Sequence, residues 1–517
     1  MNNKFINIII IICTLSILGM PINTYAEDFR RDNESDISYN GNTIITDSQT
    51  LSDKKYSSLT GGENALLVSG GSSIISNIYV TKNGDEEGET SDFYGTNAGI
   101  LVYNSATLTL NGGNILTSGK HSNGLFVYGT GIVEANELNI KTSNDNSGGI
   151  MVAGGGIINA KNLNVETSGN SSASIRSDRG GGKIQVSSGT YKTSGVGSPA
   201  IYSTANIEVK DSKLISESSE GVVVEGNNSV TLENVSLTDT NNTLNGNSET
   251  YKNIFLYQSM SGDATVGEST FIANNSDIIT NKGDTFYVTN TSAKIELTNN
   301  VFTNNDGAFL RAEAAKWGNA NNNGGNVEIK LTNQKVDGNI IIDNISSLDM
   351  SINSNSKLHG YINKDNQSQN INISLDNNSV WILEDDSYIT SLNNNKNDNS
   401  NIYLNGHKLY VNGISVSANN NVYSDEEENK NEENVENNTN TENTETKKTS
   451  FNFDSNFFYQ IGIAAGVLFI LILIIIIMSR KKEPKEEIVQ HDITTNKVLQ
   501  ENIIIKDDNE KKGLSRN

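Results

Sequence analysis

Cysteine is almost absent from this sequence of 517 residues, and its scarcity excludes several kinds of chemistry. The one cysteine, Cys13, lies in an N-terminal apolar run that we expect to be removed, so the processed chain would contain none. Such a chain can form no disulfide, no cysteine-bound zinc site and no thiol nucleophile. Its stability must come from packed secondary structure and buried aliphatic side chains.

Helical spacing of apolar residues is also missing over long stretches of the chain, which excludes the helical repeat families. Short apolar runs separated by Gly, Asn and Ser recur instead at a constant step, as from Ile100 to Leu125. Two or three short strands per step predict a parallel β-helix in which like residues stack about 4.8 Å apart. Three sets of residues keep this step: Ile100, Leu125, Ile150 and Ile175; Ile115, Ile140 and Val165; and Thr117, Thr142 and Thr167.

We therefore predict an all-β fold, a right-handed parallel β-helix over residues 43–416, preceded by an N-terminal segment, residues 27–42. The length of the repeat region corresponds to about thirteen coils. Insertions interrupt the step at residues 84–94, 242–249 and 313–325. Loops that leave a regular scaffold often carry binding residues, so these insertions are the first places to look for function.

Long hydrophobic runs are confined to the two ends of the chain. Lys4, the apolar run that follows it and a small-residue site ending at Ala26 predict a signal peptide over residues 1–26. Residues 461–478 are apolar and uncharged, which predicts one C-terminal transmembrane α-helix over residues 456–479.

The residues around the predicted membrane helix define an expected topology. Arg480, Lys481 and Lys482 follow the helix directly, which places residues 480–517 in the cytoplasm as a tail. Residues 417–455 are rich in Asn and Glu and poor in apolar residues, which predicts an acidic, disordered stalk. We expect a single-pass type I protein of the cell membrane with an extracellular β-helix.

Positive charge is scarce outside the tail. The formal net charge is −23, and the tail and the signal peptide contribute +1 each, which leaves −25 on residues 27–479. Such a surface repels polyanions, so we expect no nucleic acid partner.

Five short segments stand out between residues 257 and 348. They are residues 257–264 (YQSMSGDA), 283–291 (GDTFYVTNT), 317–318 (WG), 323–326 (NGGN) and 343–348 (DNISSL). In these segments, and over about residues 60–415, the chain resembles adhesin-like right-handed parallel β-helix surface proteins of Gram-positive (Firmicute-type) bacteria. That family is similar to pectate-lyase-like and autotransporter-passenger β-helices. The resemblance implies a cell-surface, adhesin-like protein and no particular activity.

An enzyme is the first alternative, because many β-helices cleave acidic polysaccharides as lyases or glycoside hydrolases. None of the five arginines between residues 27 and 455 stands at coil spacing from an Asp cluster, as a lyase would need. Glu384, Asp385 and Asp386 resemble the acidic pair of polygalacturonases, but that family's Gly-His-Gly and Arg-Ile-Lys segments are missing. We therefore expect no catalytic residue, no cofactor and no metal site. A purely structural envelope protein is the third possibility.

Trp317 is the first candidate for ligand binding. It lies in the third insertion beside Arg311 and Lys316, and its flat apolar body and indole N–H suit a sugar ring. The alternative is a short helix over residues 312–316 with Trp317 packed against the side of the β-helix. The other tryptophan, Trp381, is flanked by apolar residues and is predicted to be buried.

The second candidate is a basic loop in which Arg176, Arg179 and Lys183 flank three glycines. Free backbone N–H groups and cations suit a carboxylate or sulfate group, whereas the alternative is a turn with solvated charges. Together the two groups favour an adhesin-like rod that presents its loops to an extracellular glycan or protein ligand. The sequence does not identify that ligand.

Overall fold

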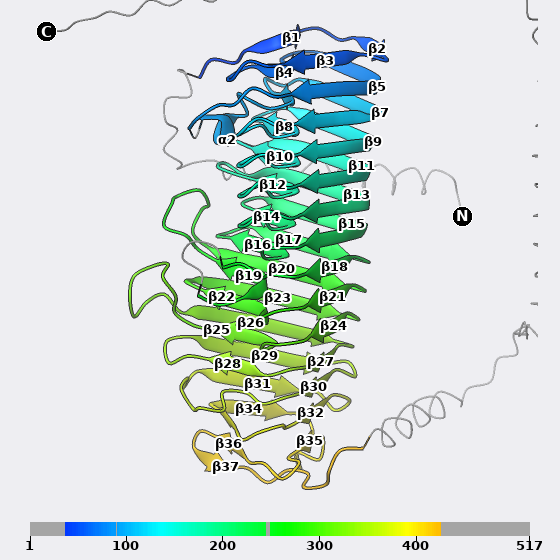
Figure 1. Ribbon diagram of the computed structural model, residues 1–517. Coiled ribbons are helices and arrows are strands. Elements are labelled where there is room, and N and C mark those ends of the chain that lie inside the picture. The colour runs from blue at the N-terminus through cyan, green and yellow to red at the C-terminus, as the bar shows by residue number, and fades with distance from the viewer. Residues whose placement is uncertain (1–36, 89, 245–248, 425–517) are drawn as a thin grey trace, which may run out of the picture. The chain divides into compact units, whose positions relative to one another are not determined.

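The computed structural model describes residues 37–88, 90–244 and 249–424, which belong to one compact unit. Here the chain winds into a right-handed-type parallel β-solenoid of about 15 turns (Figure 1). The all-β prediction is confirmed for these residues, whose one helix is α2 (Thr90–Tyr94). The turns outnumber the expected thirteen, because the constant step from Ile100 to Leu125 already fits about 15 times into residues 43–416.

Several predicted segments lie outside the described residues. They are the signal peptide (1–26), the transmembrane helix (456–479), the cytoplasmic tail (480–517) and most of residues 27–42 and 417–455. Within the described part of the chain, no helix combines the length and the apolar character that a membrane crossing requires.

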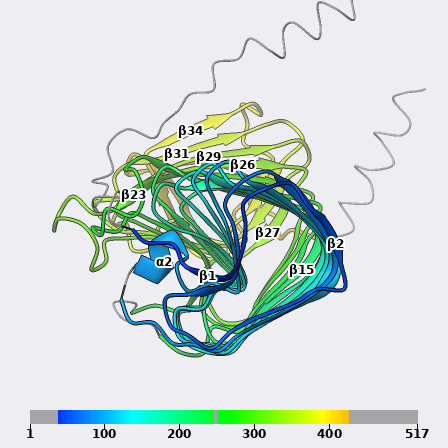
Figure 2. The ribbon, with the colours of Figure 1, turned by 90° about the horizontal axis from the view of Figure 1, so that it is seen from above.

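The first face of the solenoid is a 12-stranded parallel sheet, here called sheet A. Each coil contributes one short strand, and the chain returns to the sheet only after completing a turn (Figure 2). In order, its strands are β1 (Gly41–Ile45), β4 (Asn64–Val68), β6 (Ile100–Val102), β8 (Leu125–Tyr128), β10 (Ile150–Ala153), β12 (Ile175–Ser177), β14 (Ile201–Ser203), β16 (Val222–Glu225), β19 (Lys252–Tyr257), β22 (Asp284–Thr289), β25 (Leu310–Ala312) and β28 (Ile340–Ile342).

The second face, sheet B, consists of longer strands that bend in the middle. The bend falls where a residue has a positive φ, as at Glu137 (56°) and Asn162 (55°), and Asn tolerates this conformation better than most residues. Its early strands are β2 (Thr50–Ser52), β3 (Lys55–Ser58), β5 (Ser72–Lys82), β7 (Thr107–Thr117), β9 (Ile132–Thr142), β11 (Gly156–Thr167), β13 (Gly182–Thr193) and β15 (Asn206–Ser216).

After β15 the bend divides three coils of sheet B into two strands each, and the four later coils keep one strand each in this sheet. The side chains at these bends stack outside the solenoid, and Asn234 Nδ2 donates a hydrogen bond to Asp211 Oδ1 at 2.6 Å. These strands are β17 (Ser229–Glu233), β18 (Ser236–Asp239), β20 (Glu268–Asn274), β21 (Asp277–Thr280), β23 (Thr291–Thr298), β24 (Val301–Asn304), β26 (Gly325–Thr332), β29 (Ser347–Asn353), β31 (Ile371–Leu375) and β34 (Ser391–Asn394).

Two small sheets complete the C-terminal coils. Sheet C contains β27 (Lys335–Asp337), β30 (Lys357–His359), β32 (Val380–Ile382) and β35 (Ile402–Tyr403), and sheet D contains β33 (Ser387–Ile389), β36 (Leu409–Val411) and β37 (Ile414–Ser415). The β36–β37 pair is antiparallel, so the last strand folds back instead of starting another coil.

The interior is a stack of aligned apolar columns. Ile100, Leu125, Ile150 and Ile175 pair in register across β6, β8, β10 and β12, and all four are fully buried. Trp381 is also fully buried and donates its indole N–H to Gly360 O at 3.0 Å. These two predictions are confirmed. A single coil cannot bury its own apolar side, so stability depends on the stack.

A second column runs along the corner where sheet B ends, and we call it the hydroxyl ladder. Thr117, Thr142 and Thr167 pair in register there, as predicted, and the Thr117 hydroxyl donates to Ser122 O at 2.6 Å. Two members carry ionisable side chains, Lys82 and Asp239. In full the ladder is Ser58, Lys82, Thr117, Thr142, Thr167, Thr193, Ser216, Asp239, Thr280 and Asn304.

Candidate functional site

Sheet A has an outward face because successive residues of a strand point to opposite sides. In β12, for example, Ile175 fills the interior and the next residue, Arg176, points away from it. The outward residues pair in register from strand to strand and form one outer column. Its members are Leu67, Leu101, Phe126, Met151, Arg176, Tyr202, Val223, Phe255, Tyr287, Arg311 and Ile341.

The character of the outer column changes along the solenoid. Leu67, Leu101, Phe126 and Met151 form a buried apolar cluster, whereas the members from Arg176 to Arg311 are mostly charged or aromatic. The loops that follow β19 and β25, residues 258–267 and 313–324, lie over this second part. It is the candidate functional site.

Three rings form what we call the aromatic ledge, Phe255, Tyr257 and Trp317. The Phe255 and Tyr257 rings stack with centroids 4.4 Å apart and planes 15° apart, and the Trp317 ring lies 5.3 Å from each. Trp317 is half-buried, and no described residue accepts a hydrogen bond from its indole N–H. Phe255 is buried, so Trp317 and Tyr257 are the rings that a ligand could reach, together with the unpaired indole donor.

The 313–324 loop holds Trp317 by its backbone. Asn323 Nδ2 donates hydrogen bonds to Trp317 O at 2.8 Å and to Ala315 O at 2.7 Å. The helix considered over residues 312–316 does not form, because Ala312 ends strand β25 and the following residues have no regular structure. Asn290 lies against this loop at Gly318 and donates to Gln258 O at 2.7 Å, so it joins the two loops.

Glu225 fixes the 258–267 loop through hydrogen bonds. Its carboxylate is buried and accepts hydrogen bonds from Tyr202 at 2.5 Å, from Tyr257 at 2.9 Å and from the Ser259 hydroxyl. Burial and the nearby carboxylate raise the pKa of both tyrosines well above the usual value, so they stay protonated and donate. Three hydroxyl donors converge on this one carboxylate, so the network holds Tyr257 in the ledge.

The two cations predicted beside Trp317 are paired with carboxylates. Arg311 Nε lies 2.6 Å from Asp284 Oδ2, and its Nη1 lies 3.7 Å from Glu313 Oε2. Lys316 is exposed and its Nζ lies 3.0 Å from Glu249 Oε1. The structure therefore brings Arg311, Lys316 and Trp317 to one face, with neighbouring acids balancing both positive charges.

The fold separates Lys183 from the two arginines of the predicted basic loop. Arg176 Nη2 lies 2.9 Å from Asp178 Oδ2, and Arg179 Nε lies 2.6 Å from Asp263 Oδ1 in the 258–267 loop. The Arg179 guanidinium also lies over the Phe93 ring at 3.6 Å, so it connects α2 with that loop. Lys183 lies in β13 of sheet B, in register with Ile157 and Asn206, away from the arginines' sheet.

Asp178 is the most perturbed carboxyl of this group. It is buried, and burial raises its pKa to about 6 although the Arg176 charge acts in the opposite direction. The arginines hold loops in place through these contacts.

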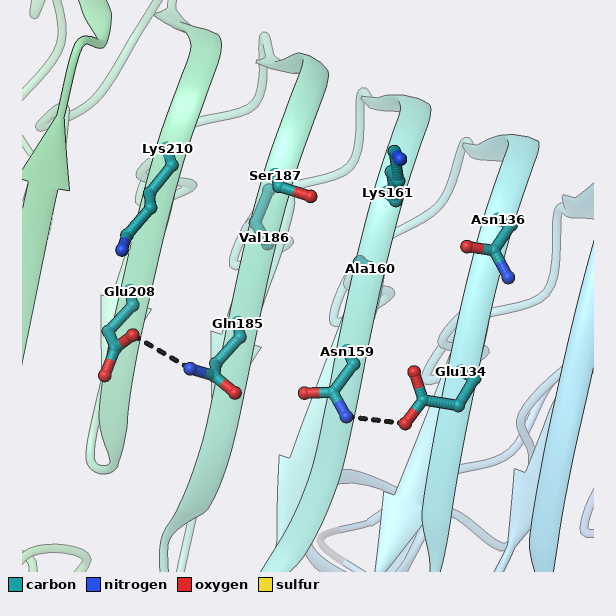
Figure 3. Close-up of a pocket in the computed structure, with 10 residues that line it drawn as sticks. All are labelled: Glu134, Asn136, Asn159, Ala160, Lys161, Gln185, Val186, Ser187, Glu208 and Lys210. Carbon is teal, nitrogen blue, oxygen red and sulfur yellow. Dashed lines mark hydrogen bonds between the residues drawn. The ribbon is translucent and has the colours of Figure 1, made fainter. Parts of the chain in front are cut away.

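Sheet B carries a shallow polar groove on its outward face, across β9, β11, β13 and β15 (Figure 3). Asn159 Nδ2 donates to Glu134 at 2.6 Å, and Gln185 Nε2 donates to Glu208 at 2.9 Å. Glu134 and Glu208 lie three coils apart, roughly 14 Å at the usual strand spacing. Paired carboxylates of glycosidases lie within about 9.5 Å of each other. These two acids are too far apart to act as such a pair.

Two groups of side chains near the C-terminal end have the composition of metal ligands. One is Asp337, His359 and Glu384, in which both imidazole nitrogens lie 3.4 Å from a carboxylate. The other is Asp385, Asp386 and His407, where Lys364 Nζ already lies 2.5 Å from Asp385 Oδ2. The acids of both groups therefore already have basic partners, His359 in the first group and Lys364 beside the second.

Sequence reasoning missed Glu225, Tyr202 and Phe255. A signal for the outer column was present, because Arg176 is the residue after Ile175 in the recurring run and Tyr202 follows Ile201. The contact between Glu225 and Ser259 has no such signal, because it depends on the path of the 258–267 loop.

Comparison with protein-family models, with curated proteins and with solved structures gives no match to this chain. The site must therefore be interpreted from its own geometry.

Proposed function

We propose that this chain is an adhesin-like surface protein that binds an extracellular glycan or protein through the aromatic ledge. Its β-solenoid would act as a rod outside the cell, with the C-terminal apolar run as a single membrane anchor. The resemblance to adhesin-like β-helix proteins of Gram-positive bacteria supports this proposal, as do the signal-peptide and anchor patterns of the sequence.

The observation that carries the proposal is the half-buried Trp317, whose indole N–H is bonded to no described residue, on a surface of stacked rings. The neighbouring 258–267 loop adds two large exposed apolar side chains, Met260 and Val266, at 68 and 79 % exposure. Aromatic rings that combine apolar area with a polar atom are frequent centres of binding energy at interfaces.

The competing proposal is a polysaccharide-degrading enzyme. The groove on sheet B offers carboxylates at Glu134 and Glu208 whose separation does not suit glycosidic hydrolysis. The binding proposal therefore has the stronger structural support.

Trp317→Ala tests the proposal in the full chain, kept in a mild detergent. The matched control is Tyr410→Ala, which removes a half-buried ring stacked on Tyr388 at 4.7 Å in sheet D. Both variants and the parent would be applied to an array of glycans and extracellular-matrix proteins, and their melting temperatures would be measured.

For any probe that the parent binds, we expect Trp317→Ala to weaken binding at least tenfold and Tyr410→Ala to leave it unchanged. The melting temperature should stay within a few degrees for Trp317→Ala. Unchanged binding, or a loss that only follows a lowered melting temperature, would show that Trp317 serves packing instead.

A further inference from the structure

One position of the hydroxyl ladder differs from all the others. The other members donate hydrogen bonds at the corner, including Lys82, whose ammonium lies 2.8 Å from Gly84 O and 3.0 Å from Thr60 O. Asp239 occupies the same column between Ser216 and Thr280 and is fully buried. An ionised carboxylate can only accept, so it cannot replace the ladder hydroxyl.

Neither carboxylate oxygen of Asp239 has a hydrogen-bonding partner among the described residues. The backbone N–H of Asn241 faces the carboxylate without reaching hydrogen-bonding geometry. Two neighbouring side-chain oxygens, Asn241 Oδ1 and Asn253 Oδ1, are also buried and without a partner in the described part of the chain. A buried acceptor without a donor is costly, and here there are four on three residues.

Strand register and hydrogen bonds bring the three residues to neighbouring positions at one corner of the solenoid. Asn253 Nδ2 donates to Thr280 Oγ1 at 3.0 Å, next to Asp239 in the ladder, which leaves Asn253 Oδ1 beside Gly221. A Cβ atom at Gly221 would lie 2.2 Å from that oxygen, so only glycine leaves room for it. Asn241 Nδ2 donates to Lys252 O at 3.0 Å, directly before Asn253.

The charge at this corner is unbalanced. Glu220 and Lys252 form a buried pair, with Lys252 Nζ 3.6 Å from Glu220 Oε1. That pair neutralises itself, and no described cation is left for Asp239. The corner therefore needs either a proton or a bound cation.

We propose that Asp239, Asn241 and Asn253 form a buried calcium site at the base of the second insertion. Ca²⁺ prefers six to eight oxygen ligands, mixing carboxylates with amide and backbone carbonyls. One proton on Asp239 would supply one donor and leave the remaining acceptors unpaired, whereas a cation at this corner would take oxygens of more than one residue as ligands. The ion would fix the start of the 242–249 insertion, whose Glu249 pairs with Lys316 beside Trp317.

The experiment compares the full chain with Asp239→Asn, Asp239→Thr and the control Asp277→Asn, an exposed acid of β21. Each protein is freed of metal with a chelator. Its melting temperature and its heat of binding are then followed on titration with CaCl2, with MgCl2 and NaCl at matched ionic strength as comparisons.

For the parent and Asp277→Asn we expect one Ca²⁺ per chain and a melting temperature that rises with Ca²⁺ concentration. Mg²⁺ should act more weakly, because it requires a smaller octahedral site. Asp239→Asn should weaken Ca²⁺ binding at least tenfold. Asp239→Thr restores the ladder hydroxyl, so it should melt higher than the chelated parent and no longer respond to Ca²⁺.

Three results would overturn the proposal. If Asp239→Asn keeps the calcium response, the ion binds elsewhere on the acidic surface. If NaCl is as effective as CaCl2, the site does not select a divalent ion. If the parent ignores Ca²⁺ but loses stability as the pH rises from 5 to 8, and Asp239→Asn removes that dependence, a proton fills the corner.

Discussion

The coils between residues 100 and 200 and those between residues 220 and 325 share one interior but differ on the outside. In the first region the buried column repeats at a constant step, through Ile100, Leu125, Ile150 and Ile175. In the second region the step varies. The steps from Val222 to Ile254 and from Ile254 to Phe286 are long, because the chain between them makes longer loops, whereas the step from Phe286 to Leu310 is short. The interior residues remain in register throughout.

This difference separates two roles of the repeat. Interior columns must stay aligned, because each coil uses its neighbours to bury its apolar side. Loops between strands carry no such constraint, so they can lengthen wherever a corner is fixed by other means. In the second region, Glu225 and Asp284 provide that fixation through contacts with Ser259 and Arg311. Arg179 of the first region adds an ion pair to Asp263 in the 258–267 loop.

The largest expected effect on stability comes from a substitution in the regular region. Ile150→Asp buries a charge without a partner in the interior column, so the free energy of unfolding should fall by about 4 kcal/mol or more. Hydrogen exchange should quicken in β8, β10 and β12 but much less in β22, because each coil contacts only its neighbours.

The control is Ile157→Asp, in β11 of the same coil but half-buried and pointing outward. Its charge can remain in water, so a small effect is expected. Equal losses of unfolding free energy in the two variants would contradict the assignment of Ile150 to the interior. Hydrogen exchange that quickens uniformly along the chain would contradict the expectation that each coil affects mainly its neighbours.

A second, smaller effect concerns pH where the two regions meet. The pKa of Asp178 is raised to about 6 in the folded chain, against 3.8 as its ordinary value. The folded state therefore binds this proton more tightly than the unfolded state does. Its contribution is complete below about pH 4 and is lost as the pH rises through 6, with a slope of up to about 1.4 kcal/mol per pH unit.

Denaturant unfolding between pH 4 and 7 measures this slope in the parent and in Asp178→Asn. The variant also alters the Arg176 contact, so the comparison uses the change of slope and not the absolute stability. A slope that is unchanged in Asp178→Asn would assign the pH dependence to other groups.

The regular region could be predicted almost completely from sequence. A fixed step and like residues at each step determine which atoms stack, and the columns of Ile100 and Thr117 follow from this alone. The expected coil count was too low although the regular step predicts about 15 coils, and the later coils depart from that step, as between Leu310 and Ile340. In these later coils the position of each strand depends on its contacts with the neighbouring coil.

The candidate site was predictable only in part. Trp317, Arg311 and Lys316 are neighbours in sequence, so an irregular insertion with an aromatic residue and two cations was enough to identify them. Their acidic partners Asp284 and Glu249 come from other coils, and an insertion has no repeat from which its register could be read. The same reason explains why Lys183 was grouped with Arg176, since the strand boundary between them was not recognised.

The smallest expected effect on stability concerns a single hydrogen bond of the hydroxyl ladder. In the regular region Thr142 is fully buried, and its hydroxyl donates to Ser147 O. Thr142→Val keeps the volume but leaves that carbonyl without its donor, so the free energy of unfolding should fall by about 1–2 kcal/mol. Thr81→Val is the control, because Thr81 points outward from β5 and its change should cost less than about 0.5 kcal/mol. Denaturant unfolding of both variants measures the difference. If the two variants were equally stable, the ladder would be a consequence of stacking and would not stabilise the corner.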